Sequence, residues 1–128
     1  MSVIEESRSP DWEVRRDAVR GLGLLLPAIE PLNRLVALLD DDNIAVEQEA
    51  AEALVRHGGR DGLRSVFEVL GRRRDDPDAD YIAYRLRELQ IFESVPIMER
   101  AREIANSSAG ELALDGIRQL EELIGPGQ

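Results

Sequence analysis

Apolar residues recur along the chain at a spacing typical of α-helices. Two sets of three have a spacing of four residues, and the second set follows the first after 32 residues. Residues four apart share one face of an α-helix, so each set predicts an amphipathic helix with one buried stripe. The two sets are Val14, Ala18 and Leu22, and Val46, Ala50 and Leu54.

The same pattern returns near the end of the chain. A third copy follows the first after 98 residues and ends at Leu120. A shift of 98 is close to three times 32, which leaves room for one more copy between. Repeats of this length are typical of stacked arrays, because one unit cannot bury its apolar face without its neighbours.

Seven helices are expected from the apolar pattern and its breaks. Each carries its apolar residues on one stripe and is separated from the next by turn-forming residues. The apolar residues of the expected helices fall within residues 14–22, 32–39, 46–54, 63–70, 82–89, 97–104 and 112–124.

Capping residues indicate where several of these helices begin and end. Ser9 is expected to cap the first helix, with Pro10 in its first turn. The two glycines within residues 21–23, followed by Pro27, are expected to end that helix. Asn43 is expected to cap the third helix, and residues 108–111 form a capping box before the seventh.

Residues 72–92 break the repeat. The connection at 72–80 is longer than its equivalents, and the helix after it is out of register by three or four residues. Both tyrosines lie in this segment, at Tyr81 and Tyr84. Irregularity in a regular array arises either from function or from the drift of one unit, and the sequence leaves both open.

Residues 32–54 resemble the HEAT-repeat consensus. That consensus is an apolar helix, an aspartate-rich turn (here residues 40–42) and a helix with the pattern Val-x-x-x-Ala-Ala-x-x-Leu. The similarity is good over residues 9–70, fair over 94–124 and poor over 75–92. The chain is therefore similar to small bacterial HEAT-like proteins of the PBS-lyase type.

The resemblance carries an expectation about the fold. It implies an all-α, right-handed α-solenoid of about three and a half helical hairpins, with about seven helices in total. It also implies a single HEAT-like domain over residues 1–128.

Charge and composition narrow the function. The net charge is −10, with −5 in each half of the chain, because 26 acids outnumber 16 basic residues, all of them arginine. Such a charge repels nucleic acid and anionic lipid and attracts basic partners. The longest apolar run, residues 24–29, is too short to span a membrane, and no secretion signal is recognised. A cytoplasmic location is expected.

The sequence offers few groups for catalysis or metal binding. It contains no cysteine and one histidine, His57, which is expected at a helix end. Residues 76–80 resemble the opening of a calcium loop, but Tyr81 and Arg87 occupy the positions that need glycine and glutamate. We therefore expect no enzymatic activity, no cofactor and no metal.

The resemblance also indicates candidate binding residues. In HEAT-like arrays the second helix of each pair lines the concave side, so residues opposite the buried stripes are expected to share one groove. Ile91 and Leu114 lie on that side, and Tyr84 is either an interface anchor or inter-repeat core. Trp12 is expected to pack at the core or at the end of the array. The predicted partner-binding residues are Arg16, Arg20, Gln48, Glu52, Tyr81, Tyr84, Glu88 and Arg118.

These observations favour a non-enzymatic protein-binding module that is monomeric when free. A small, acidic array without a catalytic set suits an immunity or antitoxin-type inhibitor of a basic toxin. The alternatives are a generic scaffold and a lyase- or glycosylase-like HEAT enzyme accessory. The charge of −10 and an aromatic content of 4% count against a DNA glycosylase, which needs a basic groove and aromatic residues.

Overall fold

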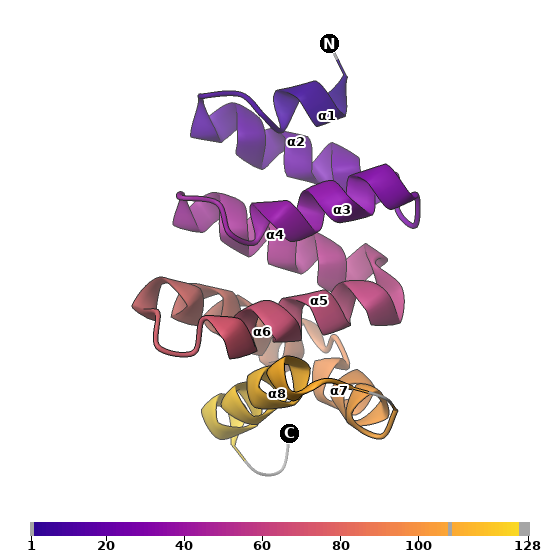
Figure 1. The fold of residues 1–128 in the computed structure, drawn as a ribbon, viewed down its shortest axis with the longest axis vertical. Coiled ribbons are helices and arrows are strands. Elements are labelled where there is room, and N and C mark those ends of the chain that lie inside the picture. The colour runs from indigo at the N-terminus through magenta and orange to yellow at the C-terminus, as the bar shows by residue number, and fades with distance from the viewer. Residues whose placement is uncertain (1, 108, 126–128) are drawn as a thin grey trace. The chain divides into compact units, whose positions relative to one another are not determined.

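The structure is a computed structural model that describes residues 2–107 and 109–125 (Figure 1). Every regular element within these residues is a helix, so the all-α prediction is confirmed. The helices α2 to α8 correspond to the seven expected ones, whereas α1 and the 3₁₀-helix η1 have no counterpart in the apolar pattern. The elements are α1 (Val3–Glu6), α2 (Trp12–Leu24), α3 (Ile29–Leu38), α4 (Ile44–His57), α5 (Gly59–Arg72), η1 (Pro77–Ala79), α6 (Asp80–Glu93), α7 (Ile97–Ala105) and α8 (Glu111–Ile124).

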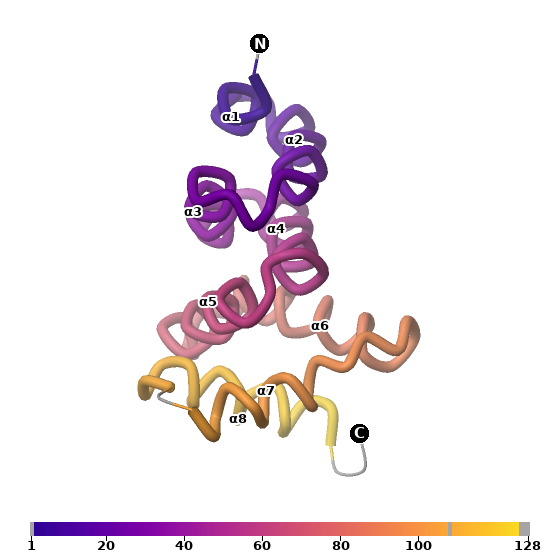
Figure 2. Tube along the Cα trace, turned by 90° about the vertical axis from the view of Figure 1, so that its right-hand side faces the viewer, coloured from indigo at the N-terminus to yellow at the C-terminus, as the bar shows by residue number. Residues whose placement is uncertain are grey.

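The chain divides into two compact units, Met1–Gly62 and Leu63–Gln128. In the first unit, α1 and α3 form one layer and α2 and α4 form the other (Figure 2). In the second unit, α8 packs on both α6 and α7. The expectation of a single domain over residues 1–128 stays a prediction.

The predicted apolar stripes form the cores of the two units. Leu22 of α2, Leu35 of α3 and Leu54 of α4 are fully buried in the first unit. Phe67 of α5 and Leu86 of α6 are fully buried in the second. Burial of one such side chain contributes about 1.5–3 kcal/mol, so these stripes supply the main driving force for packing the helices.

The start of α2 differs from its prediction. Asp11 is the N-cap, and its carboxylate accepts the N–H of Glu13 at 2.9 Å. Ser9 instead accepts the N–H of Asp11 at 3.1 Å, and Pro10 precedes the cap. The prediction that Ser9 caps the helix is wrong because its hydroxyl forms the turn that leads into the cap.

The end of α2 agrees with its prediction. The helix ends at Leu24, between Gly23 and Pro27, and Gly21 lies against α1. A side-chain carbon at Gly23 would be 3.3 Å from both Ala53 Cβ and His57 Cδ2 of α4. Both glycines therefore serve close packing between helices, which outweighs their low helix propensity.

Two further caps were predicted. Asn43 caps α4 as expected, and its side-chain oxygen accepts two N–H groups of the first turn at 2.9 and 3.3 Å. At α8 the first helical residue is Glu111, with Gly110 in the N-cap position and no side-chain cap. Glu111 is therefore not the third helical residue that a capping box needs, and Ser108 lies outside the described residues.

Arg15 joins the loops that precede α2 and α4. Its Nε–H and Nη2–H donate to the two carboxylate oxygens of Asp41 at 3.0 Å each, and its Nη1–H donates to the Ser9 carbonyl at 2.9 Å. The two side chains are only 13% and 9% exposed, and the hydrogen bond to Asp41 raises the pKa of Arg15. Asp41 also accepts the N–H of Asn43 at 3.0 Å, so this ion pair positions the cap of α4.

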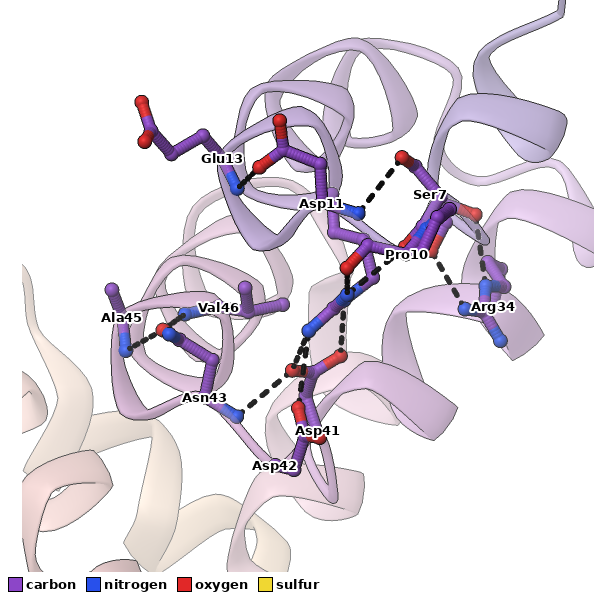
Figure 3. A network of polar contacts seen from close by, with 12 residues as sticks. Ser7, Pro10, Asp11, Glu13, Arg34, Asp41, Asp42, Asn43, Ala45 and Val46 are labelled. Atoms are coloured by element: carbon purple, nitrogen blue, oxygen red, sulfur yellow. Dashed lines mark hydrogen bonds and ion pairs between the residues drawn. The ribbon is translucent and has the colours of Figure 1, made fainter.

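A second arginine ties α1 to α3 (Figure 3). Arg34 donates from Nε to Ser7 Oγ and from Nη2 to the Ser7 carbonyl, both at 2.8 Å. Ser7 is fully buried, and its hydroxyl donates to the carbonyl of Ile4 at 2.6 Å. Burial and the nearby charge of Arg8 lower the pKa of Arg34. Ser7 therefore accepts hydrogen bonds from the partly buried guanidinium, and these bonds hold the end of the short helix α1 against α3.

In the second unit, the backbones of α5 and α8 touch at two glycines. A side-chain carbon at Gly116 would collide with the carbonyl group of Phe67, whose carbon lies 2.8 Å away. A side-chain carbon at Gly71 would collide with the carbonyl group of Leu112 in the same way. Gln119 of α8 also donates to a main-chain oxygen of α5 at 3.0 Å. Glycine at both positions is therefore required for α5 and α8 to lie this close together.

The irregular connection after α5 is ordered by Asp76. Its carboxylate accepts the N–H of Asp78 at 3.0 Å and pairs with Arg73 at 3.0 Å, and both interactions lower the pKa of Asp76. The carboxylate thereby caps η1, and α6 begins directly after it at Asp80. This part of the segment that resembles a calcium loop is thus used for local hydrogen bonding.

We expect the substitution Gly116→Ala to destabilise the protein by about 1–3 kcal/mol through overpacking against α5. Helix propensity alone would make the same substitution stabilise the protein by about 1 kcal/mol. The sign of the change in the free energy of unfolding therefore separates the two effects. The midpoint of urea denaturation measures it. Gly110→Ala is the control for an added methyl group outside this contact, since a side-chain carbon there meets nothing within 4 Å, and loss of the N-cap glycine should cost at most about 1 kcal/mol. A Gly116→Ala midpoint at or above that of the parent chain would contradict the backbone contact.

Candidate functional site

The predicted partner-binding residues lie on helices of both units. Those of the first unit come from α2 and α4, and those of the second come from α6 and α8. Within the first unit, Arg20 and Glu52 line one pocket. Within the second, Tyr84 and Glu88 line another. The expectation that all eight residues share one groove stays a prediction.

Trp12 and Arg16 form a pair on the outer face of α2. The guanidinium carbon of Arg16 lies 5.2 Å from the centroid of the Trp12 ring, a cation–π distance. Arg16 also pairs with Asp17 at 3.2 Å. Trp12 is 38% exposed and absent from the buried core, so of the two places expected for it the core is wrong, and packing at the end of the array stays a prediction. The exposed ring lies beside the guanidinium of Arg16.

A pocket of about 330 Å³ lies between the C-terminal halves of α2 and α4. Arg20 and Leu24 line it from α2, and Glu52, Arg56 and His57 line it from α4. His57 is the last residue of α4, as expected from the sequence, and its ring reaches Gly23 of α2. The sole histidine of the chain therefore lines a charged pocket. The sequence predicted its place at a helix end but not this pocket.

The charges in this pocket are partly compensated. Glu52 and Arg56 form an ion pair at 2.8 Å, one helical turn apart. Arg20 is exposed and has no hydrogen-bond or ion-pair partner among residues 2–107 and 109–125. The C-terminal ends of α2 and α4 are electronegative, an effect of about 0.3–1 kcal/mol on a charge in the last turn. Arg56 and His57 in that turn of α4 offset it.

The second unit carries an aromatic surface on α6. We define the α6 face as Tyr81, Tyr84, Ile91 and Phe92, which are the exposed large apolar residues of this helix. The rings of Tyr81 and Tyr84 pack edge to face, with centroids 5.9 Å apart and planes at 82°. Tyr84 is 41% exposed and Phe92 is 80% exposed. Of the two alternatives for Tyr84, exposure supports the interface anchor over inter-repeat core.

Two pockets border the α6 face. One has a volume of about 450 Å³ and is lined by Tyr84 together with Asp80 and Glu122. The other, of about 590 Å³, is lined by Tyr84, Glu88 and Phe92. Tyr84 therefore lines both hollows.

Phe92 is the residue of this face that the sequence interpretation missed. Its signal was present, since residues 84, 88 and 92 follow one another at a spacing of four. Arg118, by contrast, is exposed on α8 and pairs with Asp115 at 2.9 Å. Neither pocket that borders the α6 face includes Arg118 among its lining residues.

Comparisons with known proteins decide the family. The family model for HEAT repeats matches residues 2–89, which is more than half of the chain. The chain belongs to the HEAT-repeat family. No curated protein and no solved structure matches the chain. HEAT repeats are generally protein-interaction modules, so family membership places this α-solenoid chain in that class.

Within the described residues, no group of three or more histidine, aspartate or glutamate side chains is arranged to hold a metal ion. None of the described helices is long and apolar enough to cross a membrane.

We expect Arg16→Ala to uncover the indole of Trp12. Acrylamide quenching of tryptophan fluorescence should increase, and the loss of the cation–π contact should cost about 0.5–1 kcal/mol of stability. Arg20→Ala is the matched control, because Arg20 lies one turn further along α2 and lines the pocket. Equal quenching in both variants would show that Arg16 does not shield the ring in solution.

Proposed function

We propose that this HEAT-repeat chain is a non-enzymatic protein-binding module whose partner contacts the α6 face. The observation that carries the proposal is the exposure of Tyr81, Tyr84 and Phe92 on one helix beside two pockets. Contiguous exposed apolar surface is uncommon on soluble domains and is typical of interaction sites. The chain has five aromatic residues in total, so three exposed on one helix is a strong concentration.

Packing within the second unit supports this choice of face. α6 buries Ile82, Leu86 and Leu89 on one side, so its helical fold does not need the exposed aromatic residues. The rings are held on a regular helix, and a rigid aromatic anchor loses little conformational entropy on binding. A partner side chain that fills either hollow beside Tyr84 would bury that ring further.

Charge supports a partner of basic character. The chain carries −10, and Asp80, Glu88 and Glu122 line the two pockets with Arg74 and Arg87. An acidic field accelerates the encounter with a basic protein and disfavours nucleic acid and anionic membranes. Arg118, on α8 of the same unit, is proposed to contribute at the edge of the contact. The predicted binding residues of the first unit, among them Gln48, stay predictions.

The most specific form of the proposal is an immunity or antitoxin-type protein. In this form the chain is a cytoplasmic monomer when free and masks the basic surface of a toxin without chemistry of its own. Its small size, its acidic charge and the aromatic anchors support this form over a generic scaffold. Protection of cells that express a neighbouring toxin gene is its direct test, and absence of both protection and a stable complex contradicts it.

We expect Phe92→Asp to abolish capture of the partner from a lysate of the source organism. A charge buried in an apolar contact weakens the binding free energy by several kcal/mol. Because each 1.4 kcal/mol is about a tenfold change in Kd, the complex would no longer survive capture. Ile29→Asp is the matched control, because Ile29 is an equally prominent exposed apolar residue on α3 of the first unit. Quantitative mass spectrometry of the captured proteins gives the readout. A partner retained by both variants places the contact outside the α6 face.

We also expect association with that partner to depend strongly on salt. Steering by an acidic surface raises association rates by about 10- to 1000-fold at low ionic strength. Measured by surface plasmon resonance, the association rate should fall at least about tenfold between low and high salt, while the dissociation rate changes less. An association rate that is independent of salt would contradict a basic partner.

A further inference from the structure

The pocket between α2 and α4 lies wholly in the first unit and has no role in the proposed contact with the α6 face. Its volume of about 330 Å³ is at the lower end of the range for small-molecule sites. Two lining residues set the distance between the helices at this pocket. Gly23 lets α4 approach α2, and the ring of His57 lies 3.3 Å from the position that a side-chain carbon at Gly23 would take.

Arg20 supplies the uncompensated charge of this pocket. Arg56 is already engaged with Glu52 at 2.8 Å, whereas Arg20 has no partner within the described part of the chain. A guanidinium presents a planar fork of N–H donors that matches the two oxygens of a carboxylate. His57 adds a ring N–H at the same pocket. The geometry therefore offers donors to one planar anion.

The acidic lining limits the charge of that anion. Glu49 and Glu52 lie in the same pocket. A phosphate with two charges would meet both carboxylates at short range, and like charges there oppose binding. A single carboxylate carries only one negative charge, and its ion pair with Arg20 offsets that charge. The pocket therefore selects a monoanion over a phosphate.

The remaining wall is apolar. Val19 and Ala53 form a buried floor, and Leu24 stands exposed at the rim. An apolar chain laid over these side chains would remove them from water, which favours binding in proportion to the area covered. We infer that the pocket binds an organic carboxylate with a short apolar chain, its carboxylate on Arg20 and its chain against Leu24.

Two kinds of ligand carry a carboxylate next to a short apolar chain. One is a free small carboxylic acid, and the other is the C-terminal carboxylate of a polypeptide that ends in an aliphatic residue. Both present a monoanion next to an apolar group of similar size. The inference concerns the shared chemistry, and the experiment distinguishes the sources.

The test is a titration of the intact ¹⁵N-labelled chain, followed by NMR, with 4-methylpentanoate and with its neutral amide. We expect saturable shifts of amide signals within residues 19–24 and 49–57 for the acid. The amide should bind at least about tenfold more weakly, because it lacks the charge that Arg20 recognises. Equal binding of acid and amide, or shifts that do not saturate, would overturn the inference.

Variants assign the carboxylate to its arginine. Arg20→Gln should weaken binding of the acid about tenfold, and Arg20→Lys should fall between, since lysine keeps the charge but not the fork. Arg8→Gln is the matched control, because Arg8 is an exposed arginine of the same unit and lies outside the pocket lining. Unchanged affinity in Arg20→Gln would overturn the assignment even if the acid binds.

A second pair of probes separates the sources. N-acetyl-Ala-Ala-Leu with a free C-terminus is compared with the same peptide amidated. Tighter binding of the free-terminus peptide than of 4-methylpentanoate supports recognition of a polypeptide C-terminus. Tighter binding of the small acid supports a free ligand. Binding of neither carboxylate overturns the inference and leaves the proposed contact at the α6 face unaffected.

Discussion

Close packing between helices, made possible by glycine, is the constraint on which both units depend. Gly71 and Gly116 bring α5 and α8 together so closely that a methyl group at either position meets a main-chain carbonyl. With α8 fixed on α5, its contact with α6 brings Tyr84 of α6 and Glu122 of α8 to one pocket. Gly23 has the same effect in the first unit, where the approach of α4 to α2 creates the charged pocket.

Arginine is the only basic side chain apart from one histidine, and it takes several physical roles here. Arg15 and Arg34 are enclosed and satisfy main-chain carbonyls, so they act as cross-links between elements of the first unit. Arg16 covers an indole ring. Arg20 has none of these tasks and remains available in a pocket. Its difference from the others lies in its surroundings, since the residue type is the same.

Periodicity predicted the helices and their buried stripes because both depend on local spacing. It failed where the outcome depended on contacts between distant residues. The packing role of Gly23 was missed because the sequence does not show that Ala53 of α4 lies against it. Phe92 was overlooked because α6 carries apolar residues on two sides, and spacing alone does not say which side is buried. The register of α6 was nonetheless right, since Leu86 is fully buried.

The uneven distribution of aromatic residues gives the molecule a built-in spectroscopic probe. The only tryptophan, Trp12, lies in the first unit, whereas both tyrosines, Tyr81 and Tyr84, lie in the second. Tryptophan emission, excited at wavelengths that tyrosine does not absorb, therefore monitors α2 alone. The first unit reports its own unfolding or ligand binding without any attached dye.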